Sequence, residues 1–233
     1  SDVVVYHPAD HRLLLCDSLQ KKDRFETFPA FSPDGRTLYF CSAEAKKIPE
    51  EYKEIRYNLC SIDFDPSTGT FGSRIDTLVN AEALGKSVSF PRPSYDGKYI
   101  MFTLSDYGNF SIWHKEADLW LLDLTSGDLR KLSEVNSDDT ESFHNWSSNS
   151  RWFVFSSRRG DGLYTRLYLA SMDENGKISK PFLLPQEDPE TYYDRSVYSY
   201  NVPDFTSEPI KIDTRVFEKK ITSKERIQVQ AKK

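Results

Sequence analysis

The chain has 233 residues, of which 38% are hydrophobic, 14% aromatic and 29% charged, and its formal net charge is −5. This length allows a substantial core, in one large β domain or two small ones. The many aromatic residues exclude a disordered chain and favour pleated sheets.

The charge is distributed unevenly along the chain. Residues 211–233 contain eight Lys and Arg against three Asp and Glu, so this segment carries +5 and the remainder −10. An acidic body argues against nucleic-acid binding, which needs a basic surface. We interpret the basic end as a solvated extension, and an arm for a partner is the alternative.

Cysteine usage and hydropathy exclude further classes of protein. Cys16, Cys41 and Cys60 are odd in number and show no C-x-x-C spacing, so neither a zinc site nor a complete disulfide framework fits them. No stretch approaches 18 apolar residues, and we therefore expect no membrane span. The first residues do not have the pattern of a signal peptide, although removal of a signal would leave such a chain.

The first 26 residues contain two short strand-like runs, residues 3–6 and 12–16, around a polar turn. A longer pattern then occurs three times. It begins TFPAFSPDGRTLYF at residues 27–40, SFPRPSYDGKYIMF at 89–102 and SFHNWSSNSRWFVF at 142–155, so that an aromatic residue leads each copy at Phe28, Phe90 and Phe143. Each copy predicts a strand, a tight turn and a second strand.

Each copy continues in the same way. A loop follows the second strand, and a third strand is predicted at residues 57–64, 118–123 and 166–172. Turn residues rich in Asp, Asn and Gly then precede a short fourth strand at 74–79, 129–132 and 181–184. The unit is therefore four antiparallel strands.

Four-stranded units repeated every 50 to 60 residues are typical of β-propeller blades, so the fold class is all-β. A β-sandwich is the main alternative, but it would not repeat one turn sequence at the same place in each group of strands. The predicted organisation is outer strands of a preceding blade (1–26), three blades (27–80, 81–133 and 134–185), and a partial strand at 196–200 with the basic tail (186–233). Three complete blades do not close a ring, so we expect this chain to be a fragment of a larger propeller, or its ends to pair with each other or with a second chain.

The repeat resembles the WD-repeat-like propeller repeat of TolB-type proteins. PAFSPDGRTLYF (29–40) carries the resemblance most clearly, and LWLLDLTSGDLRKLS (119–133) is similar to the second half of that repeat. The third copy departs from it, since Ser148-Asn149-Ser150 replaces Pro-Asp-Gly. The resemblance covers residues 27–184 and implies a bacterial protein, periplasmic or attached to the cell envelope, that binds other macromolecules.

Motifs for catalysis are absent from the sequence, so we expect no enzymatic activity, no cofactor and no metal. Neither G-x-S-x-G nor a phosphate-binding loop occurs. His7 and His11 flank a turn and are expected to be surface residues. We expect His144 to line the central channel, where holding water is favoured over catalysis.

Candidate binding residues lie in the loops after each second strand, which propeller geometry places on one face together with the connections between blades. We call this the long-loop face. Its aromatic and basic side chains are of the kinds that anchor interfaces. The candidates are Tyr107, Phe110, Trp113, His114, Arg158, Arg159 and Tyr164. For Trp113, folding back over the blade edge is an equal alternative. The acidic residues 133–141 are expected to form a solvated connection, with an ion or a basic partner as the alternative.

The sequence therefore predicts a scaffold or binding module whose long-loop face contacts a protein or a glycan. One alternative is a propeller enzyme, such as a metal-assisted polysaccharide lyase with His114 and His144 near the channel mouth. Another is the gating propeller of a serine peptidase whose catalytic domain lies elsewhere.

Overall fold

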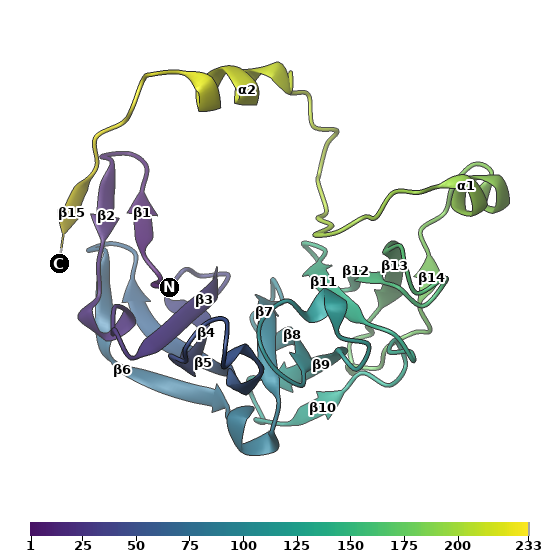
Figure 1. Ribbon diagram of the computed structural model, residues 1–233, viewed down its shortest axis with the longest axis horizontal. Coiled ribbons are helices and arrows are strands. Elements are labelled where there is room, and N and C mark those ends of the chain that lie inside the picture. The colour runs from purple at the N-terminus through teal and green to yellow at the C-terminus, as the bar shows by residue number, and fades with distance from the viewer. Residues whose placement is uncertain (233) are drawn as a thin grey trace.

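The computed structural model describes residues 1–232, and strands dominate it (Figure 1). Three sheets have four antiparallel strands each and follow one another along the chain. Blade 1 contains β3 (Arg24–Phe31), β4 (Thr37–Glu44), β5 (Asn58–Asp65) and β6 (Thr70–Val79). Blade 2 contains β7 (Ser87–Pro93), β8 (Tyr99–Ser105), β9 (Asp118–Asp123) and β10 (Leu129–Lys131). Blade 3 contains β11 (Glu141–Trp146), β12 (Trp152–Ser157), β13 (Arg166–Ser171) and β14 (Phe182–Leu183).

A smaller sheet contains β1 (Val5–His7), β2 (Arg12–Leu14) and β15 (Gln230–Lys232). β15 pairs with β2 in parallel, so the C-terminal segment returns to the N-terminal hairpin after crossing the open side of the arc of blades (Figure 1). The helices are short: η1 (Asp17–Leu19), η2 (Tyr52–Glu54), η3 (Glu82–Leu84), η4 (Ser111–Trp113), α1 (Pro189–Arg195) and α2 (Arg215–Thr222). None of the described helices is both long and apolar enough to cross a membrane.

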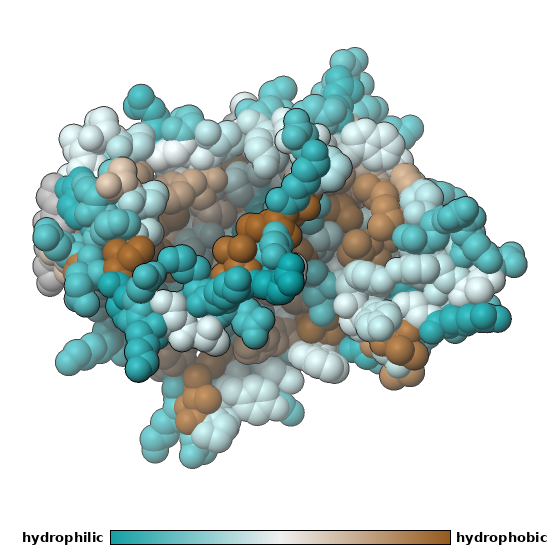
Figure 2. Space-filling view, turned by 90° about the horizontal axis from the view of Figure 1, so that it is seen from above, coloured by the Kyte–Doolittle hydropathy of each residue, from teal (hydrophilic) through white to brown (hydrophobic). Residues whose placement is uncertain are grey.

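The prediction of an all-β partial propeller is confirmed, with three complete four-stranded units where the repeat places them. The prediction of a strand at residues 196–200 is wrong, because this segment is irregular. Of its backbone N–H groups, only that of Tyr200 donates to the backbone of blade 3, to the carbonyl of Thr165 at 3.1 Å. The residues after blade 3 form α1 and α2 instead, and their apolar side chains stay exposed. Figure 2, which looks onto the side carrying α2, shows apolar and hydrophilic side chains interspersed there.

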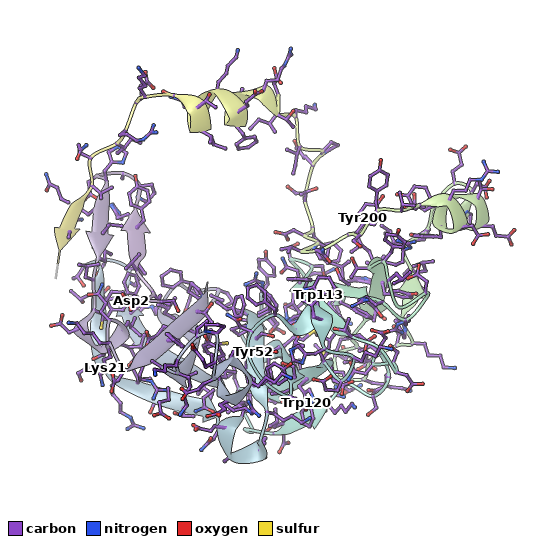
Figure 3. All side chains as sticks on the ribbon, in the orientation of Figure 1. Asp2, Lys21, Tyr52, Trp113, Trp120 and Tyr200 are labelled. Atoms are coloured by element: carbon purple, nitrogen blue, oxygen red, sulfur yellow. The ribbon has the colours of Figure 1, made fainter. Side chains whose placement is uncertain are left out.

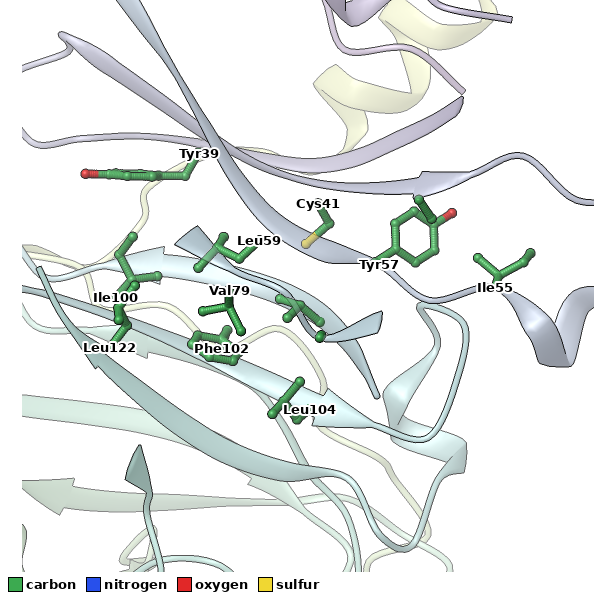
Figure 4. Packing of buried hydrophobic residues seen from close by; sticks show 13 residues of the cluster. Tyr39, Cys41, Ile55, Tyr57, Leu59, Val79, Ile100, Phe102, Leu104 and Leu122 are labelled. Atoms are coloured by element: carbon green, nitrogen blue, oxygen red, sulfur yellow. The ribbon is translucent and has the colours of Figure 1, made fainter. Parts of the chain in front are cut away.

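Apolar packing between neighbouring sheets forms the core. Residues alternate along β4: Tyr39 and Cys41 pack toward blade 2, whereas Leu38 and Phe40 pack toward the N-terminal segment. This two-sided pattern fits strands that are covered on both faces. Figure 4 shows the cluster between blades 1 and 2, in which Phe102 is fully buried.

The turn in each repeat has a local cause. Asp34 accepts hydrogen bonds from the Ser32 hydroxyl (2.6 Å) and the Arg36 N–H (3.0 Å). These bonds, the Ser32 bond first, lower the pKa of Asp34 below its usual range. Gly35 adopts φ of +70°, a conformation that glycine takes without steric cost. Asp34 is therefore a turn residue of the scaffold.

A β-bulge interrupts the first strand of each blade at the leading aromatic residue of the repeat. Phe28, Phe90 and Phe143 lie within the register shifts and have φ of +52°, +53° and +49°. Positive φ strains a bulky side chain, and bulges re-aim the residues that they contain. The three rings meet, with centroids 4.1 Å apart between Phe28 and Phe90 and 4.7 Å apart between Phe90 and Phe143. They form a column along the inner ends of the blades.

We expect Phe102→Ala to lower the free energy of unfolding by about 3–5 kcal/mol, because it leaves a cavity between blades 1 and 2. Urea denaturation followed by circular dichroism measures the change. Tyr95→Ala is the control, since Tyr95 is 55% exposed at a turn of the same blade. A loss below about 1 kcal/mol for Phe102→Ala would contradict the packing described.

Candidate functional site

An aromatic pocket of about 620 Å³ lies on the long-loop face, where the loops of blades 1 and 2 meet. This volume is in the range of pockets that bind small ligands or side chains. Its walls come from the β4–β5 loop, the β8–β9 loop and the inner strand β3. The aromatic pocket takes its rings from Phe25, Tyr52, Tyr57, Tyr107, Phe110 and Trp113. Figure 3 labels Tyr52 and Trp113, which reach this region from blades 1 and 2.

Hydrogen bonds between the two blades hold the loops of the aromatic pocket in place. The Ser87 hydroxyl donates to the carbonyl of Gly108 (2.6 Å) and accepts from the Tyr57 N–H (2.9 Å). The Gly108 N–H donates to the carbonyl of Ile55 (2.9 Å). Because these bonds bridge the loops directly, the aromatic pocket is formed without a ligand, which reduces the entropy that binding costs.

The Trp113 turn is fixed from the side of blade 3. Ser111 is fully buried, and its hydroxyl lies 2.7 Å from that of Ser142. The Thr140 hydroxyl donates to the carbonyl of Ser111 (3.0 Å). The backbone below Trp113 is therefore anchored while its indole stays in solvent.

The rings themselves are available to a partner. Trp113 is 77% exposed and Phe110 is 71% exposed. Tyr107 packs edge-on against Tyr52 (centroids 5.7 Å apart) and against His114 (4.5 Å). Burial raises the pKa of Tyr57, deeper in the aromatic pocket, to about 12, so its hydroxyl stays protonated at neutral pH. Four of the predicted candidates, Tyr107, Phe110, Trp113 and His114, are thus brought together.

Arg158 lies behind Trp113. Its guanidinium carbon is 5.5 Å from the centre of the indole, and Nη1 donates to the carbonyl of Ile112 (3.2 Å). Nη2 donates to the carbonyl of Gly162. This cation–π contact covers one face of Trp113 and supports its position.

Arg159 is directed into the protein, although it follows Arg158 directly in the sequence. Its guanidinium contacts the Glu141 carboxylate at 2.9 Å, and its centre lies 4.6 Å from the Tyr168 ring. Glu141 is fully buried and also accepts hydrogen bonds from the hydroxyls of Ser137 (2.6 Å) and Ser157 (2.7 Å). Burial raises the pKa of Glu141, although these hydrogen bonds and the charge of Arg159 oppose the rise. The structure therefore places Arg159 in a buried ion pair and outside the aromatic pocket.

Tyr164 is also outside the aromatic pocket. Its ring lies 5.3 Å from the guanidinium of Arg166, which is 6% exposed. Arg166 donates to the carbonyls of Tyr198 (2.7 Å) and Ser196 (3.0 Å), so it fastens the irregular segment after α1 to blade 3. The sequence carries no signal for this role of Arg166, because its hydrogen-bond partners are backbone atoms more than 25 positions away.

The two histidines of the enzymatic alternative lie in different environments. His114 pairs with Glu116 (2.8 Å) on the long-loop face. His144 borders a small cavity beside the phenylalanine column, but its side chain is buried, with Nε2 2.9 Å from the carbonyl of Met101 and Nδ1 without a hydrogen-bond partner. Desolvation lowers the pKa of His144 to about 3. No group of three or more His, Cys, Asp or Glu that could hold a metal ion occurs within residues 1–232.

The predicted site residues do not include Phe25, Ile48, Ile55 or Asn109. These residues line the aromatic pocket together with the predicted aromatic residues. Ile48 and Ile55 bracket Tyr52 in one loop, which is a signal for an apolar loop surface. Phe25 carries no such signal, since it belongs to β3 and resembles any core residue.

Comparison with known proteins concerns the fold. No protein-family model matches the chain, and neither does any curated protein. TolB from Acinetobacter baumannii matches 76% of this chain and 40% of its own, with 19% identity and a TM-score of 0.41. The propeller domain of the trilobed protease from Pyrococcus furiosus matches 71% of this chain and 44% of its own, with 17% identity and a TM-score of 0.41. An oligogalacturonate lyase in complex with manganese matches 72% of this chain and 44% of its own, with 14% identity and a TM-score of 0.50.

These solved structures are all β-propeller proteins. The fold is that of a partial β-propeller. The chain spans less than half the length of each match, and the matched proteins differ in what their names describe. The match to the oligogalacturonate lyase supports the architecture that the sheets already show, and none of the three matches resolves a function.

We expect Arg159→Ala to lower the free energy of unfolding by about 3 kcal/mol, because it leaves the buried Glu141 carboxylate without its cation. Arg151→Ala is the control on the same blade, since its contact with Glu174 is long (3.9 Å) and exposed, and should cost less than about 1 kcal/mol. Chemical denaturation measures both. A double variant, Arg159→Met with Glu141→Gln, should recover most of the loss; equal losses for the two arginine variants would contradict the buried pair.

We expect the free energy of unfolding to decrease as the pH is lowered, because His144 is buried in its neutral form. The unfolded chain binds a proton on this residue below about pH 6.5, whereas the folded chain does so only near pH 3. The free energy of unfolding should therefore drop by up to about 1.4 kcal/mol per pH unit between pH 6 and 4.5. His144→Gln should flatten this slope and His7→Gln, at an exposed position, should not. Parallel slopes for wild type and His144→Gln would exclude a buried neutral histidine.

Proposed function

We propose that this chain is part of a non-enzymatic β-propeller that binds another macromolecule through the aromatic pocket of its long-loop face. The observation that carries the proposal is the exposure of Trp113 and Phe110 on loops that are already fixed by interblade hydrogen bonds. Exposed aromatic side chains on a rigid scaffold are the usual anchors of interfaces. Leaving them in water in a preformed cavity is otherwise unfavourable.

The cell envelope of a bacterium is the proposed location. It is supported by the similarity of the repeat sequence to TolB-type propeller repeats. The acidic charge of the body also disfavours a nucleic acid as the bound macromolecule.

Cross-linking in cells followed by affinity purification tests the proposal. The full gene product with Trp113→Ala and Phe110→Ala should capture its partner about tenfold less than the wild type, because hot-spot aromatic residues contribute most of the binding energy. Tyr95→Ala, an exposed aromatic residue at the other end of β8, is the matched control and should retain the partner. Capture that is unchanged in the double variant would reject the long-loop face as the binding surface.

A further inference from the structure

The lining of the aromatic pocket has an unusual chemistry for a surface site. It contains aromatic and aliphatic side chains, Ser1, Gly108, Asn109 and His114, and no Asp, Glu, Lys or Arg. The hydroxyls of Tyr52 and Tyr107 and the indole N–H of Trp113 make no hydrogen bond with any of residues 1–232. The aromatic pocket therefore presents ring faces and free hydrogen-bond donors, but no carboxylate acceptor.

This chemistry distinguishes between a glycan and a peptide. Each sugar hydroxyl is both a donor and an acceptor, and a buried hydroxyl whose proton finds no acceptor is costly. The lining has no carboxylate and its side-chain acceptors include only the neutral oxygens of Ser1, Asn109 and the tyrosines, so it matches the hydroxyl donors of a glycan less well than the carbonyls of a peptide. Proline has no N–H, so a proline-containing peptide presents carbonyl acceptors that match tyrosine and tryptophan donors.

The conformation of such a peptide also fits the rings. A polyproline II segment has no internal hydrogen bonds, is already extended in solution, and docks into grooves lined by aromatic residues. Tyr52, Tyr107 and Trp113 come from two loops that are fixed relative to each other, which gives the rings constant spacing.

Cations surround the rings. The Lys53 ammonium lies 5.8 Å from the centre of Tyr52 and 6.0 Å from that of Tyr107, and the Arg56 guanidinium is 6.0 Å from Tyr107. The neighbouring carboxylate of Glu51 accepts a hydrogen bond from the Lys47 N–H (2.9 Å), and Glu116 is paired with His114. Lys53 and Arg56 make no ion pair with any of residues 1–232, although Glu50, Glu51 and Glu54 share their loop, so acidic residues beside the proline segment would meet two cations that are not already paired.

We infer that the aromatic pocket binds an extended, proline-containing peptide segment flanked by acidic residues, supplied by a partner protein. This inference rests on the proposed function and specifies its partner. The rings of Tyr52, Tyr107 and Trp113 hold the prolines, their donors bind the peptide carbonyls, and Lys53 and Arg56 meet the flanking carboxylates.

Isothermal titration calorimetry with synthetic probes tests the inference. The probe is a blocked peptide, Glu-Glu-Pro-Pro-Ala-Pro-Pro-Glu-Glu, and the comparison peptides replace every proline by alanine or every glutamate by lysine. We expect the first probe to bind at least tenfold more tightly than either comparison peptide. Trp113→Ala should weaken binding of the first probe about tenfold, and Tyr95→Ala should leave it unchanged.

Two outcomes would overturn the inference. One is equal affinity for the proline and alanine peptides. The other is Trp113-dependent binding of cellohexaose in place of the peptides, which would make the ligand a glycan. Neither outcome affects the proposed function, which predicts that partner capture in cells depends on Trp113 and Phe110 whatever the ligand is. Loss of that dependence in cells would instead reject the proposed function itself.

Discussion

The apolar character of both faces of each sheet is the constraint on which the rest of this structure depends. Along β4 and β8, neighbouring residues point to opposite faces, yet apolar residues occur on both faces, as Leu38 and Tyr39 or Ile100 and Met101 show. A sheet of this kind cannot stand in water on one side, so both faces must be covered: blade 2 covers one face of blade 1 and the N-terminal segment covers the other. Face-to-face stacking of twisted sheets then produces the arc of blades in Figure 1.

Stacking also decides where the long loops lie relative to one another. Once blades 1 and 2 pack through their shared core, the β4–β5 and β8–β9 loops meet at the same edge, and Ser87, Gly108 and Ile55 can bond across them. The aromatic pocket is therefore a consequence of the scaffold geometry together with the residues that happen to occupy these loops. Its position on loops fixed by the scaffold explains how exposed rings such as Trp113 keep a defined arrangement.

Local signals made most of the fold predictable from the sequence. The Ser32–Gly35 turn is fixed by its own side chains, and the leading aromatic residue of each copy marks a bulge that only the structure reveals. The face that carries the site was predictable, since the strand order determines where the loops lie. Which residues come together in the aromatic pocket was not predictable, because that depends on which side chains point inward. Arg158 and Arg159 are adjacent and chemically alike, yet one supports Trp113 and the other enters a buried ion pair. Residues 196–200 have the pattern of a strand, but the segment is irregular and Arg166 holds it through the carbonyls of Ser196 and Tyr198.

The repeat also makes a second comparison possible, because blades 2 and 3 meet in the same way as blades 1 and 2. The side chains at that junction are different. Arg158 reaches across it to the carbonyl of Ile112 and the ring of Trp113, and Arg159 and Glu141 fill the space beneath with a buried ion pair. At the junction of blades 1 and 2, the corresponding loop, between β8 and β9, supplies Tyr107 and Phe110, which line the aromatic pocket. The features shared by the three copies therefore build the scaffold, and the differences between their loops determine which side chains each junction presents.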